Sequence, residues 1–137
     1  MRVIGIEIDK KRVICFALEQ DSQGSYINLT GNFRYLEIKD DLDNGQIRSF
    51  QSAIYTFFNS INPDVIAIIA RQPKGRFSSS TFSFKLEGLI QCYDRVEVEF
   101  VSPRTLAAYY KKNFFSVLFD NNYQENVAKL AYYLLNR

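Results

Sequence analysis

Glu7 is the residue whose type and position most directly suggest chemistry. It lies in the opening segment MRVIGIEID, and if that segment is a strand, every second residue from Val3 to Asp9 shares one face. A carboxylate near the end of a buried strand is unfavourable unless a metal, a cation or hydrogen bonds compensate its charge. The alternative is that Glu7 lies at the solvated end of the strand and has no special role.

The absence of histidine limits which metal such a site could use. Histidine is the commonest general base and the commonest transition-metal ligand in proteins, and this sequence has none. Metal chemistry would therefore depend on carboxylates, which bind Mg²⁺ or Mn²⁺ in preference to zinc. We expect Mg²⁺ or Mn²⁺ as the cofactor if the protein uses one.

A second candidate site is the basic segment of residues 71–85, which contains four cations, four serines, three phenylalanines and no acidic residue. It follows an apolar run, and open α/β sheets bind ligands at the carboxyl ends of their strands. Hydroxyls and backbone amides beside cations suit a phosphate, although the alternative is a solvated loop. The nucleic-acid-binding residues that we predict are Arg71, Lys74, Arg76 and Lys85, together with Arg104 near the start of a later helix.

Length and composition indicate one globular domain spanning residues 1–137. Apolar residues make up 47% of the chain and aromatic residues 15%, which is typical of a protein with a packed core. The net charge is only +2, too small to identify a partner. Residues 65–137 nevertheless carry ten basic and six acidic side chains, so the basic excess lies in the second half.

Cysteine usage and hydropathy predict a cytoplasmic protein that has no membrane span. Cys15 and Cys92 both lie in apolar segments, so we expect two buried free thiols, as in a reducing compartment. No segment reaches the roughly eighteen consecutive apolar residues of a membrane helix. Glu7 and Asp9 interrupt the N-terminal segment where a signal peptide would be apolar.

The candidate residues are positioned by an N-terminal hairpin and a central strand. Residues 2–8 and 12–18 are rich in β-forming residues on either side of a short polar link, which predicts two paired strands. Residues 26–37 predict a third strand, bent at Gly31, which completes an antiparallel meander. The uninterrupted apolar run of residues 64–70 predicts a central parallel strand that is buried on both faces.

Helices are predicted between and after these strands. An apolar stripe over residues 47–61 predicts the first helix, and the spacing of residues 82–93 predicts the second, on whose surface Glu87 should be solvated. Residues 96–100 alternate as an edge strand does. Ser102 before a proline then predicts a helix start, because serine caps helices and proline suits the first helical position.

The C-terminal region is expected to contain an aromatic segment and a last helix. Residues 113–119 form either a buried loop or part of a contact between two copies of the chain in a homodimer. Asn122 followed by Glu125 has the spacing of a capping box and predicts the start of the last helix. The residues expected to face inward on that helix are Val127, Leu130, Ala131 and Leu134.

The predicted order of elements, βββ-α-β-α-β-α-α, sets the fold class. It is an α/β protein with a mixed five-stranded sheet, made of a three-strand antiparallel meander plus two parallel strands, with helices on its faces. This order resembles the ribonuclease H-like arrangement. The segment GIEIDKKRV at residues 5–13 resembles the Gly-x-Asp-x-Gly…Arg hairpin of the RuvC and YqgF branches. Sugar kinases and actin-like ATPases share a similar hairpin, but they need two such domains and glycine-rich phosphate loops, which this chain lacks.

The resemblance implies a two-metal centre for phosphodiester cleavage. In the family, one acid lies on the first strand, another at the end of the central strand, and one or two at the start of the last helix. The first position falls on Glu7, where the family usually has aspartate, and the second falls on Ala70 or Arg71, neither of which is a ligand. Near the last helix the chain offers Asp120, Glu125 and Asn126, with Tyr123 where an acid is expected. The implied catalytic residues are Glu7, Asp120 and Glu125, and the implied metal ligands are Glu7 and Glu125.

Three hypotheses follow from these observations. The first is a RuvC-like protein that binds DNA or RNA, with metal-dependent nuclease activity weak or lost because two acidic positions are altered or absent. The second is an active, Mg²⁺-dependent, structure-selective nuclease that uses an unusual set of acids. The third is a protein-interaction module for which the ribonuclease H-like fold is only a scaffold.

Overall fold

The first two strands form a hairpin in the middle of the sheet. The computed structural model describes residues 1–71 and 81–137, and it begins with β1 (Arg2–Asp9) and β2 (Arg12–Gln20). These strands pair antiparallel over their whole length, and Lys10 adopts a φ of 58° in the tight turn between them. Both strands are buried along most of their length, as the two apolar runs predicted.

The prediction of one continuous strand over residues 26–37 is wrong. Two short strands, β3 (Tyr26–Asn28) and β4 (Tyr35–Glu37), pair with opposite ends of β2, so the described residues form a sheet of six strands instead of five. Between them, the buried Thr30 hydroxyl accepts a hydrogen bond from Ala17 N at 2.9 Å. Because a side chain satisfies that backbone donor, the chain can leave the ladder at this point.

The rest of the chain alternates helices with parallel strands. The remaining elements are α1 (Asn44–Ile61), β5 (Val65–Ile69), α2 (Thr81–Gln91), β6 (Val98–Val101), α3 (Pro103–Tyr110), the 3₁₀ helix η1 (Asn122–Gln124) and α4 (Glu125–Asn136). The strand order is β3-β2-β1-β5-β6, with β4 beside β2, and β1, β5 and β6 run parallel to one another. The first strand, β1, therefore lies directly beside the central strand, β5.

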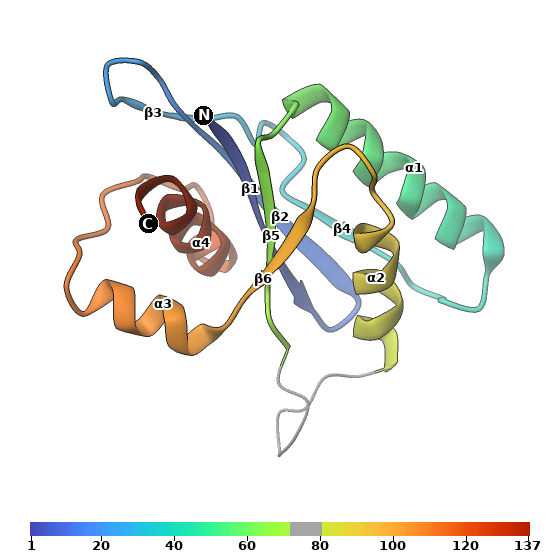
Figure 1. Ribbon diagram of the computed structural model, residues 1–137. Coiled ribbons are helices and arrows are strands. Elements are labelled where there is room, and N and C mark those ends of the chain that lie inside the picture. The colour runs from blue at the N-terminus through green and yellow to red at the C-terminus, as the bar shows by residue number, and fades with distance from the viewer. Residues whose placement is uncertain (72–80) are drawn as a thin grey trace.

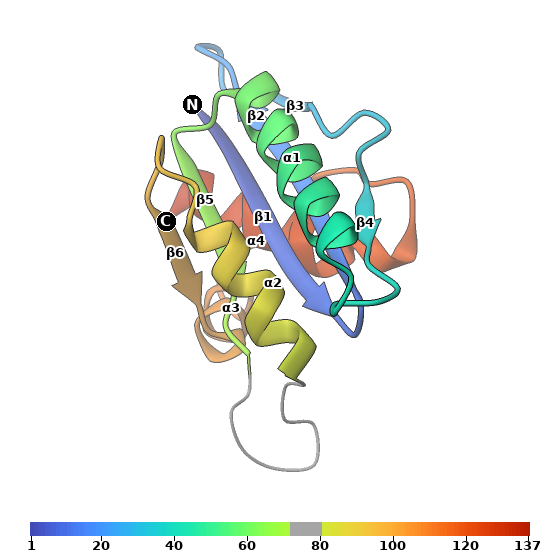
Figure 2. The same cartoon turned by 90° about the vertical axis from the view of Figure 1, so that its right-hand side faces the viewer.

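Helices cover both faces of the sheet and create two apolar cores (Figures 1 and 2). Helices α1 and α2 pack on one face, where Ile4, Ile6 and Ile68 are buried. Helix α4 packs on the other face against Val3 and Ala67, with α3 beside it. Alternate residues of β1 thus enter different cores, which explains why its apolar run is almost unbroken. The residues of α4 predicted to face inward, Val127, Leu130, Ala131 and Leu134, are all buried.

Helix boundaries follow the capping residues that the sequence offers, with one shift in register. Asp43 caps α1 by accepting from two backbone N–H groups, and Ser102 caps α3 by accepting from a backbone N–H at 3.1 Å. The C-terminal capping box is formed by Asn121 and Gln124, one residue before the predicted pair. A turn of 3₁₀ helix therefore precedes α4, which begins at Glu125.

A close contact between α4 and β1 depends on Gly5. A Cβ atom added to Gly5 would lie 2.7 Å from the carbonyl oxygen of Val127 and 3.2 Å from the backbone nitrogen of Ala131. Only glycine lets the helix backbone approach the strand this closely. Glu7 lies two residues after Gly5 and therefore points to the same face of β1. The close contact at Gly5 thus brings the first turn of α4 over Glu7.

Some side chains in apolar segments are exposed in the structure. Cys15 is buried, but Cys92 is exposed, because it follows the last residue of α2 and the next residue, Tyr93, takes the inward position. In the segment of residues 113–119, Val117 is buried whereas Phe114 and Leu118 are 85% and 89% exposed. A homodimer contact there stays a prediction.

Of the helices in the described ranges, none has the length and apolar character to cross a membrane.

Candidate nucleic-acid interface

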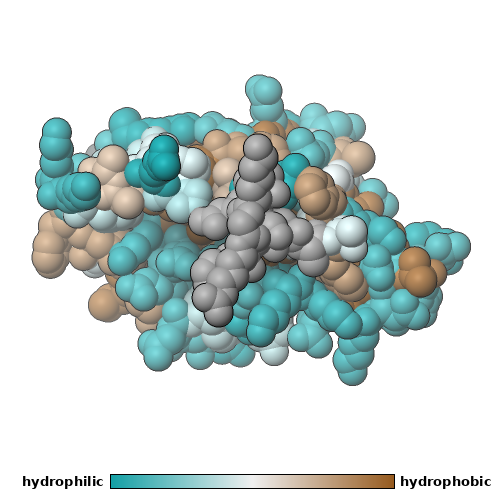
Figure 3. Space-filling view, turned by 90° about the horizontal axis from the view of Figure 1, so that it is seen from below, coloured by the Kyte–Doolittle hydropathy of each residue, from teal (hydrophilic) through white to brown (hydrophobic). Residues whose placement is uncertain are grey.

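The candidate residues gather at one end of the sheet, which we call the rim. The rim is the end at which β1, β5 and β6 finish, at Asp9, Ile69 and Val101. Helix α3 starts directly after β6, and the first turn of α4 contacts Glu7, so the N-termini of both helices lie at this end. Figure 3 views the molecule from this side, where hydrophilic residues predominate. Helix N-termini carry partial positive charge, which favours anionic ligands at such an end.

Glu7 is held at the rim by a residue from the far end of the chain. Asn126 in the first turn of α4 donates a hydrogen bond from Nδ2 to Glu7 Oε2 at 3.1 Å. Burial raises the pKa of the Glu7 carboxyl above its usual value, while the hydrogen bond from Asn126 opposes that shift and the charge of Asp9 adds to it. The carboxylate is thus only partly compensated, which is a common property of functional residues.

A polar pocket of about 300 Å³ surrounds this pair. Arg12 lies within it, where it forms an ion pair with Asp9 at 3.2 Å and places its guanidinium 5.1 Å from the ring centre of Tyr123. A guanidinium that already holds one carboxylate still has donors directed elsewhere, so it can bind a phosphate oxygen. The polar pocket is lined by Glu7, Asp9, Arg12, Ile14, Asn122, Tyr123, Glu125 and Asn126.

The acids of the polar pocket do not fit a two-metal centre. Glu7 accepts from Asn126, Asp9 is paired with Arg12, and Glu125 is paired with Lys129 at 3.2 Å. Two divalent cations a few ångströms apart need several unpaired anionic ligands, because their own repulsion must be overcome. Within residues 1–71 and 81–137, no group of three acidic or cysteine side chains has a geometry that could hold a metal ion.

The sequence-predicted acids take different places in the structure. Glu125 opens α4 and lines the polar pocket with Glu7. Asp120 is exposed ahead of η1, and it is not among the described residues that line either pocket containing Glu7. At the end of the central strand, the Ala70 backbone N–H donates to Val101 O at 2.8 Å.

The Arg71 side chain contacts α2, on the face of the sheet opposite to that of Glu7. Its guanidinium is paired with the Glu87 carboxylate of α2 and lies 4.0 Å from the ring centre of Phe84. The prediction that Glu87 is solvated is wrong, since its exposed fraction is only 6%. A buried carboxylate needs a charged or hydrogen-bonding partner, and Arg71 supplies it. Arg71 therefore connects the end of β5 to α2.

The other predicted cations are divided among several environments. Lys85 is paired with Asp41 at 3.0 Å, which links α2 to the segment before α1. Arg104 is exposed in the first turn of α3, beside the rim. Lys74 and Arg76 lie outside the described residues.

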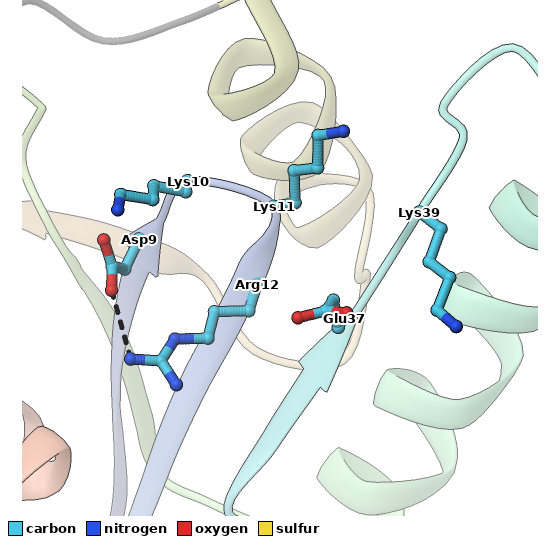
Figure 4. Close-up of a pocket in the computed structure, with 6 residues that line it drawn as sticks. All are labelled: Asp9, Lys10, Lys11, Arg12, Glu37 and Lys39. Carbon is cyan, nitrogen blue, oxygen red and sulfur yellow. Dashed lines mark hydrogen bonds and ion pairs between the residues drawn. The ribbon is translucent and has the colours of Figure 1, made fainter.

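A basic pocket that the sequence analysis missed lies beside the polar pocket. It has a volume of about 470 Å³ and is formed by the β1–β2 turn and the end of β4. In Figure 4, the Arg12 guanidinium points toward Asp9, whereas the Lys11 and Lys39 side chains point away from that ion pair. The run Lys10-Lys11-Arg12 was visible as a charge cluster, but only the fold places Lys39 next to it. The basic pocket is lined by Asp9, Lys10, Lys11, Arg12, Glu37 and Lys39.

A third pocket, more apolar than the others, lies between α3 and α4 on the opposite side of Glu7. Its volume is about 290 Å³. The Tyr110 hydroxyl donates to the backbone oxygen of Lys129 and joins the two helices at this point. The apolar pocket is lined by Glu7, Ile69, Pro103, Leu106, Ala107, Tyr110, Asn126 and Lys129.

The architecture resembles that of solved Holliday junction resolvases. The fold matches Thermus thermophilus RuvC with a TM-score of 0.71 at 10% identity, over 96% of this chain and 91% of that one. T. thermophilus RuvC in complex with a Holliday junction substrate also gives a TM-score of 0.71, at 11% identity. That match covers 99% of this chain and 97% of the RuvC chain. The yeast mitochondrial Holliday junction resolvase Ydc2 gives 0.52 at 13% identity, over 79% of this chain and 53% of that one. These matches confirm the predicted ribonuclease H-like, RuvC-like fold.

Sequence comparison places the chain in a family. A search of curated proteins finds no match to this sequence. A family model described as "Protein of unknown function (DUF3010)" matches residues 1–134, which is nearly the whole chain. The protein therefore belongs to the DUF3010 family and has the fold of the RuvC-like resolvases.

Proposed function

We propose that this protein binds nucleic acid along the rim, with metal-dependent phosphodiester cleavage that is weak or lost. The observation that carries the proposal is that two acids implied by the RuvC-like resemblance already have partners, Glu7 with Asn126 and Glu125 with Lys129, directly beside Arg12 and a lysine-lined pocket. A guanidinium and lysines at the same end of the sheet as two helix N-termini favour a phosphate over a dication.

The fold and the charge distribution support nucleic acid as the partner. One solved relative in fold, T. thermophilus RuvC, is in complex with a Holliday junction substrate. In the present chain, the Lys10-Lys11-Arg12 run and Lys39 give the rim several cations, and Arg104 lies at the start of α3 on the same end. Phosphate contacts of this kind position a nucleic acid without reading its sequence.

Charge reversal at the hairpin turn should weaken this binding. We expect the double substitution Lys10→Glu and Lys11→Glu to lower the affinity for duplex or junction DNA by tenfold or more at low salt, by order of magnitude. Each lost phosphate contact removes about 0.9 from the slope of log affinity against log salt, so the slope should fall by roughly two. Fluorescence anisotropy titrations at several salt concentrations, with single-stranded DNA, duplex, junction and RNA, measure both quantities.

Lys111 and Lys112 provide a matched control. They are also adjacent and exposed, but they follow the C-terminal end of α3, away from the hairpin turn. The same charge reversal there should change the affinity by less than about threefold. Equal losses for the two double variants would show that net charge, not the rim, governs binding. If the unmodified protein binds none of the four nucleic acids at low salt, the protein-interaction hypothesis replaces this one.

Cleavage is the alternative function, and one observation favours it. Glu7, Asp9 and Glu125 line the same polar pocket, and the loss of the ion pairs with Arg12 and Lys129 would free two of these carboxylates, Asp9 and Glu125. We expect little or no cleavage of junction, flap or RNA substrates in Mg²⁺ or Mn²⁺, because Asp9 and Glu125 are ion-paired and Glu7 is hydrogen-bonded. Cleavage that disappears in a Glu7→Gln variant would establish the nuclease, whereas cleavage that survives this substitution would indicate a contaminant.

A further inference from the structure

The three pockets at the rim form one continuous surface. Glu7 and Asn126 line both the apolar pocket and the polar pocket, and Asp9 and Arg12 line both the polar pocket and the basic pocket. A ligand that extends along this surface therefore meets cations at one end and an apolar cavity at the other. A nucleotide has this polarity, since its phosphate is anionic and the faces of its base are apolar.

The apolar pocket has the size and walls for one ring system. Its volume of about 290 Å³ is at the lower end of the range for small-molecule sites. Ile69, Leu106 and Pro103 provide apolar walls, and Glu7 and Asn126 provide polar groups at one side. Proteins that hold an extruded base use the same combination, with apolar or aromatic walls on the faces of the base and hydrogen bonds to its edge.

Glu7 selects the kind of base edge that can enter. Of the described residues, Asn126 is the one whose side chain donates a hydrogen bond to this carboxylate, and the bond uses Oε2. A carboxylate can accept about four hydrogen bonds, so this single bond leaves both oxygens of the partly buried Glu7 able to accept more. An ionised carboxylate accepts on both oxygens, so a ligand with two adjacent N–H groups compensates it best.

We infer that the apolar pocket binds an unpaired guanine base of a nucleic acid held on the rim. Guanine presents two neighbouring donors, N1–H and the N2 amino group, on one edge, and both can donate to Glu7. On the same edge, adenine and cytosine each present a hydrogen-bond donor next to an acceptor. Thymine presents one donor between two acceptors. This inference rests on the nucleic-acid binding proposed above, and it names the structural feature of the nucleic acid that the protein selects.

The test compares three DNA duplexes that differ at one position. The first carries a single unpaired guanine, the second an unpaired thymine, and the third an abasic site at the same place. We expect the unmodified protein to bind the guanine duplex roughly tenfold or more tightly than the abasic one, as for a bidentate contact to a base. The thymine duplex should resemble the abasic one. Fluorescence anisotropy at fixed salt gives the three affinities.

Leucine substitutions at two exposed alanines of α3 distinguish filling of the apolar pocket from a general effect of a larger side chain on this helix. Ala107 lines the apolar pocket, whereas Ala108 is exposed and is not among its described lining residues. Ala107→Leu should remove the preference for guanine and leave the affinity for the abasic duplex unchanged. Ala108→Leu, the same change on the next residue, should retain the preference. Glu7→Gln should also lose it, because glutamine offers one acceptor and one donor.

The outcomes distinguish this inference from the proposed function. If the protein binds none of the duplexes, nucleic-acid binding itself is wrong. If it binds all three equally and with a steep salt dependence, the rim binds phosphate but the pocket takes no base, and the inference is overturned. A guanine preference that persists in Ala107→Leu, in a variant whose melting temperature is unchanged, would also overturn it.

Discussion

Replacing Arg71 with leucine is expected to destabilise the protein by about 3–5 kcal/mol, the cost of leaving a buried charge without its partner. The Glu87 side chain is 8% exposed, and Arg71 is the cation paired with it among the described residues. Arg71 also packs on the ring of Phe84, so the substitution removes an aromatic contact as well. Urea denaturation followed by circular dichroism measures the change in the free energy of unfolding.

The double variant Arg71→Leu with Glu87→Leu is the control for this explanation. Replacing both members of a buried ion pair with apolar side chains is often neutral, because neither charge is then removed from water. We therefore expect the double variant to recover most of the lost stability. If it is as unstable as Arg71→Leu alone, the contribution of Arg71 comes from packing against Phe84 and not from the ion pair. The cationic role predicted for Arg71 in nucleic-acid binding competes with this structural one, since its guanidinium is already engaged.

The substitution Gly5→Ala should have the second largest effect. The added Cβ would lie 2.7 Å from the carbonyl oxygen of Val127, a backbone atom that can move only if α4 moves. Overpacking of this kind costs about 1–3 kcal/mol. The displacement of α4 would also lengthen the 3.1 Å contact between Asn126 and Glu7. Thermal denaturation should show a melting temperature lower by several degrees, and binding to nucleic acid should weaken with it.

The same substitution at Gly88 in α2 should raise the stability of the protein and not lower it. No heavy atom lies within 4 Å of a Cβ built on Gly88. Alanine has a higher helix propensity than glycine, so Gly88→Ala should stabilise the protein by about 0.5–1 kcal/mol. A Gly5→Ala variant as stable as the unmodified protein would show that α4 does not need this close contact.

Much of the fold could be predicted because the decisive signals are local. The hairpin, the apolar run of β5 and the cap at Ser102 depend on residues that are neighbours in sequence, and the structure has all of them. The break between β3 and β4 could not be predicted. It depends on the Thr30 hydroxyl meeting a backbone N–H of β2, thirteen residues earlier in the chain.

The environment of single side chains was less predictable than the elements that carry them. Glu87 shares the buried face of α2 with Leu86 and Ile90, and Arg71, sixteen residues away, makes that position a buried ion pair although glutamate is usually solvated. Cys92 lies in an apolar segment but is exposed, because the preceding helix ends one residue earlier. Burial depends on what packs against a residue, and periodicity reports only which residues share a face.

The amino-acid pattern is enough to predict that Glu7 lies on a largely buried strand and that the elements follow a ribonuclease H-like order. The side chains that accompany Glu7 could not be predicted, because they come from distant segments of the chain. Asn126 is 119 residues away and reaches Glu7 because Gly5 lets α4 approach β1. Arg12 and Lys39 line the same pocket at the rim because β2 pairs with both β1 and β4. Such a site is made by contacts between distant segments, and no local pattern in the sequence encodes their distances.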